Sequence, residues 1–562
     1  MSLTRIDLAI TGVALTVVVL SYLFYRRRQL NGIRGPKAVS YLFGVEHQLK
    51  LEEYAGQLTS KWAEEYGTTY KIPGCFGVCA IQFVVGSSML TLPFMQEKIL
   101  VTSDPRAVHH ILHEHVVDYP ATREIRRLFG LVAGKSVVTA LGDDHKRHRR
   151  VLSPAFSINH MKSFAPLFQH RIAELTARWN AQVEQGTEVW DIVPWILRTT
   201  LDIIGESSFN YNFQALEDKP NKLTQALREL ENSSLGPSPL QTLKAVIPRY
   251  LPPSIPIQAK CFLTRAEQAA VKYFEAVSEK AKDMMRQSGL ALDVSVMEKE
   301  LTGKEKDVLS TKLVRANRAE DPQKQLTEYE VLSQIALLIQ AGHHTTGYSL
   351  AWVLYELARH PADQRRVYHE IQCVRARASG EFTAGDYDDL GNGWLGFCVK
   401  EALRLHPILI HLNREAKSSD VVPLEYPIES STGAAIVVEV PVQAGQRVVV
   451  DIATYNRLTS IWGTDANEWN PARFSNPMTQ SVTVGMTANI LTFSGGPKGC
   501  MGWRFALMEL HALVAGLIEQ FDFSLPEDLK IKALSMTLTL PVVVGQEEAG
   551  PMLPMVIQPR AV

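Results

Sequence analysis

The stretch FSGGPKGCMG, residues 493–502, decides how the rest of the chain is interpreted. It places Cys500, one of only six cysteines, among four glycines and directly before the helix-forming run WRFALMELHALVAGLIEQF. A cysteine just before a helix feels the positive end of the helix dipole, which favours the thiolate. Glycines leave backbone N–H groups open to the sulfur and let a large planar group approach closely. The loop alone suits a metal-ligating thiolate and a structural cysteine beside a glycine-rich turn equally well.

The spacing of the residues around Cys500 favours the metal ligand. Phe493, Gly496, Lys498, Cys500 and Gly502 form the pattern F-x-x-G-x-[basic]-x-C-x-G. This pattern resembles the haem loop of the cytochrome P450 monooxygenases. The resemblance implies that Cys500 is the axial ligand of haem iron and that the other four residues contact or border haem b. Lys498 stands where the family mostly has Arg or His, so it keeps a charge for a haem propionate but loses the bidentate fork.

Three further motifs occur in the order found in that family. AGHHTT (341–346) looks like the oxygen-binding stretch of its long central helix, EALR (401–404) like its E-x-x-R helix, and PARF (471–474) like its P-x-R-F segment. The resemblance extends to about residue 545 and looks most like fungal microsomal members. It implies a mainly α fold with a small β region, in a single large P450-type domain behind an N-terminal transmembrane helix.

Glu401 and Arg404 lie at i, i+3 on one predicted helix face. From spacing alone they could be an exposed ion pair worth about 0.3 kcal/mol. The family resemblance implies instead a buried structural triad with Arg473 that holds the segment leading to the cysteine. Removing one partner of such a network costs roughly 3–5 kcal/mol.

The stretch 341–346 carries the candidate catalytic residues. Ala341 and Gly342 weaken the predicted helix, and the Thr345 hydroxyl can compete for a backbone carbonyl, so a bend here would open room for dioxygen. Thr345 matches the family threonine that assists proton delivery. His344 replaces the usual acidic residue before it, and because histidine titrates near neutrality it can also relay protons. His343 is expected to pack or to face solvent.

The basic stretch HKRHRR (145–150) could be a solvated helix face. By resemblance, Arg149 aligns with an arginine that binds a haem propionate, although His145 stands in place of the usual tryptophan. Lys146, Arg147 and Arg150 would then be available to an acidic flavin reductase through electrostatic steering. The formal net charge of −1 gives no reason to expect nucleic acid as a partner.

The N-terminus carries an apolar run, LAITGVALTVVVLSYLFY (8–25), that meets three arginines at 26–28. At ~1.5 Å per residue this run spans a thin bilayer such as that of the endoplasmic reticulum. The arginines after it hold the following domain in the cytoplasm. We therefore expect a membrane anchor over 1–28, a Gly- and Pro-containing hinge over 29–45, and the haem-thiolate domain over 46–562. The expected location is the endoplasmic reticulum membrane, with a single pass and a cytoplasmic catalytic domain.

Periodicity along the body is mostly helical. It predicts helices over 263–288, 328–358 and 363–378, and a polar connection over 286–327. Strand-like runs cover 98–102, 435–441, 446–450 and 537–544. The segment 78–96 has no clean period and separates two pieces that would join as a hairpin. It is either a genuine apolar insertion or, because its removal keeps the reading frame and its ends suit splice boundaries, a retained intron.

The residues together predict a membrane-bound monooxygenase. Electrons from NADPH arrive through a separate cytochrome P450 reductase, and one atom of O2 enters a lipophilic substrate, as in fungal terpenoid-like secondary metabolism. The alternatives are a haem-thiolate isomerase or lyase that needs no reductase, a hydroxylase of sterols, fatty acids or xenobiotics, and a non-catalytic haem sensor. Candidate substrate walls are 118–138, 335–341 and 408–413, whose aliphatic members are Leu338, Ile339, Ile408, Leu409 and Ile410.

Overall fold

The computed structural model describes most of the chain beyond the N-terminal segment. The described residues are 30–40, 42–52, 54–76, 83–85, 88–90, 96–186, 188–217, 222–233, 238–250, 263–287, 320–321, 324–378, 380–476, 482–535 and 537–560. The predicted anchor and most of the predicted polar connection (286–327) lie outside these ranges. No helix within them combines the length and apolar character needed to cross a bilayer. The first described part of the predicted hinge packs on the body, where Ile33 pairs with Ser430 and Arg34 with Glu429.

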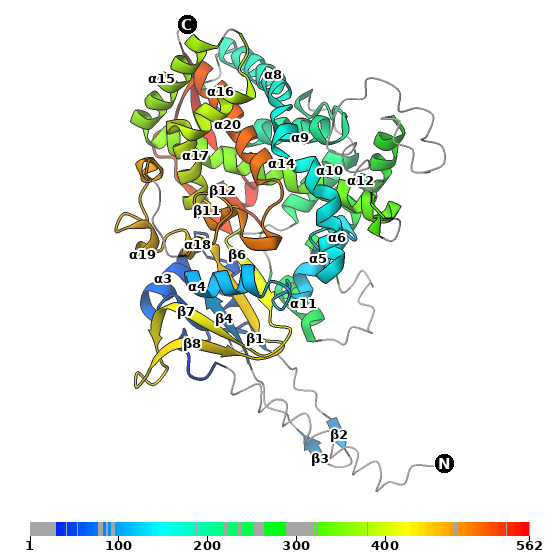
Figure 1. The fold of residues 1–562 in the computed structure, drawn as a ribbon, viewed down its shortest axis with the longest axis vertical. Coiled ribbons are helices and arrows are strands. Elements are labelled where there is room, and N and C mark those ends of the chain that lie inside the picture. Colours follow the sequence, from blue (N-terminus) through cyan, green and yellow to red (C-terminus); the bar gives the residue numbers. More distant parts are fainter. Residues whose placement is uncertain are drawn as a thin grey trace.

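Helices form the larger part of the molecule and gather at one end of it (Figure 1). Their bounds are α2 (Glu46–Lys50), α3 (Gln57–Tyr66), α4 (Pro105–His109), α5 (Arg123–Ala133), α6 (Gly142–Leu152), α7 (Ile158–Lys162), α8 (Ala165–Glu184), α9 (Val193–Phe209), α10 (Lys222–Asn232), α11 (Pro239–Tyr250), α12 (Arg265–Gln287), α14 (Glu328–Arg359), α15 (Pro361–Arg377), α16 (Ala384–Asn392), α17 (Trp394–Leu405), α18 (Ile452–Tyr455), α19 (Thr459–Trp462) and α20 (Trp503–Gln520).

The sheet with the most strands lies at the other end of the molecule, beside the hairpin of β7 and β8 (Figure 1). Its order is β1 (Thr69–Phe76), β4 (Gln96–Thr102), β9 (Arg447–Asp451) and β6 (His411–Glu415), with β4 and β9 parallel and the other pairs antiparallel. The smaller pairings are β7 (Asp420–Glu429) with β8 (Ile436–Val442), β11 (Ile531–Ser535) with β12 (Thr539–Val543), β2 (Phe83–Val85) with β3 (Ser88–Leu90), and β10 (Phe521–Ser524) and β5 (Val189–Asp191) on either side of β13 (Pro554–Pro559).

The mainly helical fold with a small β region is confirmed. The predicted helices appear as α12, α14 and α15, and the predicted strands as β4, β8, β9 and β12. The two pieces that flank 78–96 form an antiparallel hairpin, β1 with β4, with register Thr69 opposite Thr102. Within 78–96 the described residues form the short β2–β3 pair, and whether the segment belongs to the mature protein stays a prediction.

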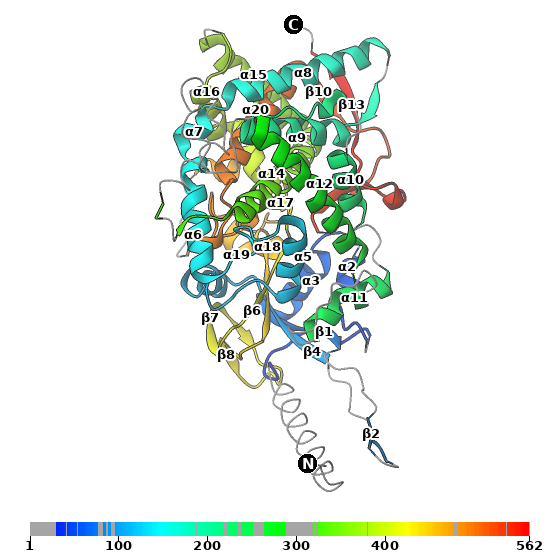
Figure 2. The same ribbon diagram turned by 90° about the vertical axis from the view of Figure 1, so that its right-hand side faces the viewer.

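Helix α14 organises the helical half of the molecule (Figure 2). Thr327 starts it with a capping box, in which the Thr327 hydroxyl accepts from the Glu330 N–H and the Glu330 carboxylate accepts from the Thr327 N–H. Such a cap satisfies donors that the first helical turn leaves unpaired. The helix then packs against α9, α17 and α20 and is buried along most of its length. This arrangement sets α14 beside the helix that follows Cys500.

Candidate active site

The cysteine loop, residues 493–502, starts at the end of a short 3-10 segment (Leu491–Phe493), contains a second one (Gly496–Lys498) and leads directly into α20. The Cys500 N–H donates to the Phe493 carbonyl at 2.9 Å, and the Gly499 N–H donates to the Gly496 carbonyl at 2.9 Å. Gly496 has φ +66°, and a Cβ placed on it would collide with the Leu112 carbonyl oxygen. Only glycine combines that backbone conformation with so close an approach. The loop is therefore shaped to present one thiol in a fixed position.

The Cys500 thiol combines two properties. Its side chain is accessible to solvent-sized groups. Burial by surrounding atoms nevertheless raises its pKa, against the Gly502 N–H and the Arg149 charge, which lower it. A group that is both accessible and desolvated faces an enclosed space rather than bulk water. The predicted preference for the thiolate stays a prediction, because burial opposes the local dipoles in the protein chain alone and a cation bound at the sulfur would favour the anion.

Four cationic side chains, Lys498, Arg149, Arg126 and Arg414, form a cation cluster beside this loop, and the His145 imidazole lies among them. Burial lowers the pKa of Lys498 to about 8, with further contributions from the Arg414 and Arg126 charges. Burial likewise lowers the pKa of His145 to about 4, assisted by Lys498 and Arg149. The Arg149 guanidinium donates to the Gly499 carbonyl at 2.9 Å, and burial lowers the pKa of Arg414 to about 10. The cluster is thus desolvated and self-repelling.

Within the described part of the chain no salt bridge joins a carboxylate to any member of the cation cluster. Desolvated cations that repel one another are stabilised by an anion. Sequence analysis identified Lys498 and Arg149 but missed Arg126, on α5, and Arg414, on β6. Neither belongs to a local motif, so only the tertiary fold shows that they reach this loop.

One face of α14 stays accessible while the rest of the helix is covered. Between Val331 and Leu354 the residues that keep accessible surface are Leu338, Gln340, Ala341, Gly342 and Thr345. All but Gln340 lie at i, i+3, i+4 and i+7, which is a single helix face. The Thr345 hydroxyl donates to the Ala341 carbonyl at 2.6 Å, as its predicted competition for a carbonyl requires. The helix remains unbroken through these residues.

His344 and His343 turn away from that face. His344 is 6% exposed and stacks on Tyr348, with ring centroids 6.1 Å apart. His343 is 4% exposed, so it packs in the interior, and burial with the neighbouring His344 lowers its pKa well below the usual value. An imidazole can accept or donate a proton through its two ring nitrogens.

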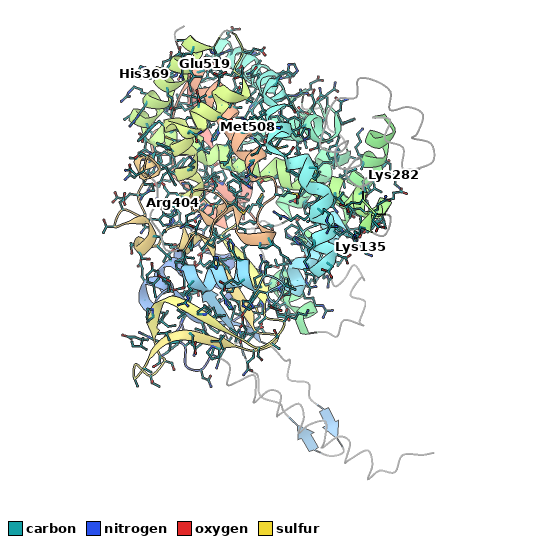
Figure 3. The ribbon with its side chains drawn as sticks, viewed as in Figure 1. Lys135, Lys282, His369, Arg404, Met508 and Glu519 are labelled. Carbon is teal, nitrogen blue, oxygen red and sulfur yellow. The ribbon has the colours of Figure 1, made fainter. Side chains whose placement is uncertain are left out.

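Glu401, Arg404 and Arg473 lie in direct contact, and the first two are fully buried. Arg404, labelled in Figure 3, donates to both carboxylate oxygens of Glu401 at 2.7 Å, and Arg473 Nε donates to Oε1 at 3.0 Å. The Asn470 N–H also donates to Oε1, at 2.9 Å. The carboxylate is therefore saturated with donors, as a buried charge requires.

Arg404 also connects this triad with the cysteine loop. Its guanidinium donates to the Asn456 carbonyl at 2.8 Å. The Asn456 side chain in turn accepts from the Leu491 N–H at 2.8 Å and donates to the Thr492 hydroxyl at 3.0 Å. The next residue, Phe493, supplies the carbonyl that holds Cys500. A continuous chain of hydrogen bonds thus joins the triad to the backbone under the thiol.

Comparison with known proteins identifies the family to which this chain belongs. The family model described as Cytochrome P450 matches residues 85–546. The chain belongs to the cytochrome P450 family. It is 29% identical to cytochrome P450 monooxygenase 91 of Postia placenta over 510 residues, 88% of each chain. It is 28% identical to cytochrome P450 monooxygenase claW of Ampulloclitocybe clavipes over 538 residues, 93% of this chain and 92% of that one.

The P450 family implies a haem-thiolate cofactor, and the residues present fit it. The accessible, desolvated Cys500 thiol would hold the iron of such a cofactor through its soft sulfur. The cation cluster supplies donors for two propionates, whose charge would replace the carboxylates that the cluster lacks in the described structure. Phe493, Gly496 and Gly502 shape the loop around the thiol. As a P450, the protein is an oxidoreductase of the monooxygenase family that uses O2 and a small-molecule substrate.

The predicted aliphatic walls are only partly accessible. Leu338 lies on the open face of α14, and Leu409 is 37% exposed. Ile339, Ile408 and Ile410 are buried in the core instead, at 8% exposure or less. A helix turns 100° per residue, so neighbours of Leu338 point elsewhere. The apolar character of a residue therefore did not tell whether its side chain is accessible to a substrate or buried in the hydrophobic core.

Glu509 on α20 is a residue that sequence analysis missed. It is fully buried, and neither carboxylate oxygen has a well-aligned hydrogen-bond partner within the described ranges. Burial raises the pKa of its carboxyl well above the ordinary value, against the Thr346 hydroxyl, which lowers it. Glu509 therefore places a desolvated carboxyl between α20 and α14, beside Thr346, the residue that follows Thr345. Nothing in its local sequence marks it, since a Glu in an amphipathic helix is usually exposed.

Proposed function

We propose that this P450 is a membrane-anchored monooxygenase that receives electrons from NADPH through NADPH–cytochrome P450 reductase and oxidises a lipophilic substrate. The observation that carries the chemistry is the desolvated Cys500 thiol beside four cationic side chains that form no salt bridge with a carboxylate in the described structure. The family match over 85–546 supports the same reaction class.

Haem, when bound, supplies the activation of O2 and the transfer of one oxygen atom to the substrate. This chain's residues hold and orient the reactants. Cys500 holds the cofactor by its sulfur, and Lys498 and Arg149 with the rest of the cation cluster bind its propionates. The Thr345 hydroxyl donates to the Ala341 carbonyl, so its oxygen is held on the open face of α14 and can accept a hydrogen bond from a water that delivers protons to the reactants. His344, the preceding residue, is the candidate for a second proton relay group on the interior side of the helix.

The residue set supports an apolar substrate. Leu338, Ala341 and Gly342 give the open face of α14 small or aliphatic groups, and the accessible Leu409 adds another. Such a lining favours burial of hydrocarbon over polar molecules. The relatives named above are fungal monooxygenases, and we place the reaction in fungal secondary metabolism, with a terpenoid-like substrate, as part of the proposal.

The redox partner and the location complete the proposal. The apolar run 8–25 followed by arginines supports a single-pass anchor in the endoplasmic reticulum membrane, with residues 46–562 as the cytoplasmic domain. Lys146 and Arg150 are exposed at the surface of α6 and can attract an acidic reductase. Arg147 is a correction to the predicted docking set, because Glu330 binds it at 2.7 Å and its side chain is only 19% exposed.

The test is product formation in microsomes with labelled dioxygen. The full chain, T345A and T345S are each assayed with reductase, NADPH and a panel of terpenoids and sterols. The wild type should incorporate one labelled atom, T345A should consume NADPH with little product, and T345S should keep most coupling because it retains the hydroxyl. Conversion without reductase, or without label, would refute the monooxygenase assignment and indicate an isomerase or lyase.

A further inference from the structure

A histidine-rich turn follows α4 and has no part in the proposed reaction. The segment HHILHEH, residues 109–115, has four histidines and one glutamate. It ends α4 and continues as a single π-turn, η1 (His110–Glu114). Such turns are rare and occur often at functional sites. His110 and His113 therefore lie in backbone that is wider than an ordinary helix, and His115 directly follows it.

Three side chains converge here from two distant parts of the chain. His110 and His115 come from this turn, and Asp420 begins β7 on the sheet side. One ring nitrogen of each histidine and one Asp420 oxygen lie within 4.8 Å of one another. His110 Nε2 is 2.8 Å from Asp420 Oδ2, and the two imidazoles stack with centroids 4.2 Å apart. Ligands at ~2.0–2.2 Å around a tetrahedral ion stand roughly 3.4 Å apart, so sub-ångström shifts would seat one.

Each of these three side chains is oriented by an outer partner. His110 Nδ1 faces Glu114 at 3.4 Å, which leaves its Nε2 for Asp420. His115 Nδ1 faces Asp118 at 3.5 Å. The Tyr119 hydroxyl donates to Asp420 Oδ2 at 2.8 Å. In protein metal sites, the ligating imidazoles are held by hydrogen bonds to carboxylates, and the ligating carboxylates are hydrogen-bonded in turn, here by a hydroxyl.

The cluster is reachable from solvent yet partly desolvated. The side chains of His110, Asp420 and His115 are 8%, 21% and 42% exposed. An ion could therefore enter and exchange past His115 and keep a water as its fourth ligand. Two imidazoles and one carboxylate suit a borderline ion such as Zn²⁺ better than Mg²⁺ or Ca²⁺, which prefer oxygen ligands.

We propose that His110, His115 and Asp420 form an exchangeable Zn²⁺ site that ties the η1 turn to strand β7. The site lies next to the cysteine loop, because the η1 backbone at Leu112 and His113 packs directly on Gly495 and Gly496. Zinc binding steadies that contact. The competing account is a metal-free hydrogen-bonded group of His110, Asp420 and Tyr119, in which His115 has no share.

Zinc binding to the untagged, haem-loaded full chain tests the proposal. Equilibrium dialysis against ZnCl₂ measures bound zinc in the wild type and in H115A, D118N and H170A. His170 is a matched control, since it faces Glu174 at 3.7 Å but belongs to no three-donor group within the described residues. The wild type and H170A should bind one zinc with the same affinity. H115A should bind at least tenfold more weakly, and D118N about tenfold more weakly, as loss of an outer partner predicts.

Equal zinc affinity of the wild type and H115A overturns the proposal and favours the metal-free group. Absence of a stoichiometric zinc in the wild type overturns it as well. Because His115 and Asp118 are both more than 40% exposed, either variant can be expected to fold, and each measures the site independently. A thermal melt should show that zinc stabilises the wild type and leaves H115A unchanged, and the reverse would contradict the proposal.

Discussion

Replacing Glu401 by Gln removes the negative charge of the triad while keeping its shape. Both Glu401 oxygens accept from Arg404, and Oε1 also accepts from Arg473 and from the Asn470 N–H. The amide can keep only one oxygen there, so its NH₂ group must face an arginine donor. Two arginines then share a buried site without their carboxylate, at a cost of roughly 3–5 kcal/mol. Typical folding free energies are ~5–15 kcal/mol, so the loss is large.

The matched control is the same substitution at Glu519, near the helical end of the molecule (Figure 3). Glu519 also binds an arginine through both oxygens, Arg375 at 2.7 and 2.8 Å, but the pair is 36% and 21% exposed. Its replacement should cost about 0.2–1 kcal/mol.

The assay follows the thiolate-type signal of the carbon-monoxide complex during urea denaturation. E401Q should lose that signal at much lower urea than the wild type, whereas E519Q should behave almost like it. Arg404 reaches the cysteine loop through Asn456. In E401Q the thiolate-type signal should therefore be lost at the same urea concentration as the circular dichroism signal of the folded protein, or at a lower one. A cost no larger than that of E519Q would refute the structural role given to the triad.

Three other predictions concern buried ionisable groups. Glu509 has a raised pKa in the folded state, so folding becomes less favourable as pH rises above the ordinary carboxyl value of 4.5, where the unfolded chain loses this proton more readily. E509Q should therefore raise the melting temperature at about pH 8 and change it little at about pH 4, as thermal melts at the two pH values would show. R414M should stabilise the haem-free protein, because it removes a desolvated cation, yet it should release haem faster to a scavenging globin. K498R should retain haem longer than the wild type, and the difference should widen above about pH 8, where Lys498 loses its proton before Arg does; a difference independent of pH would contradict this.

Local motifs, together with their resemblance to the P450 family, singled out the residues that act through one segment. Cys500 with its glycines, Thr345 with Ala341, and Glu401 with Arg404 are each defined by neighbours within a few positions. The helical period likewise predicted α12, α14 and α15, because each buries one side against the core.

Features that depend on packing from several segments could not be read from the sequence. Arg126 and Arg414 join the cation cluster from α5 and β6, and neither has a local pattern that marks it. Glu509 looks like a surface residue until α14 covers it. For Cys500 the sequence shows only the local helix dipole, whereas the burial that raises the pKa of its thiol is a property of the whole fold.

The reduced carbon-monoxide difference spectrum of the full chain in yeast microsomes, beside its C500S variant, tests the central claim most directly. The account predicts a strongly red-shifted Soret band in the wild type and its loss in C500S. A band at the ordinary thiol- or histidine-ligated position in the wild type, or an unchanged band in C500S, would contradict the assignment of Cys500 as the thiolate ligand.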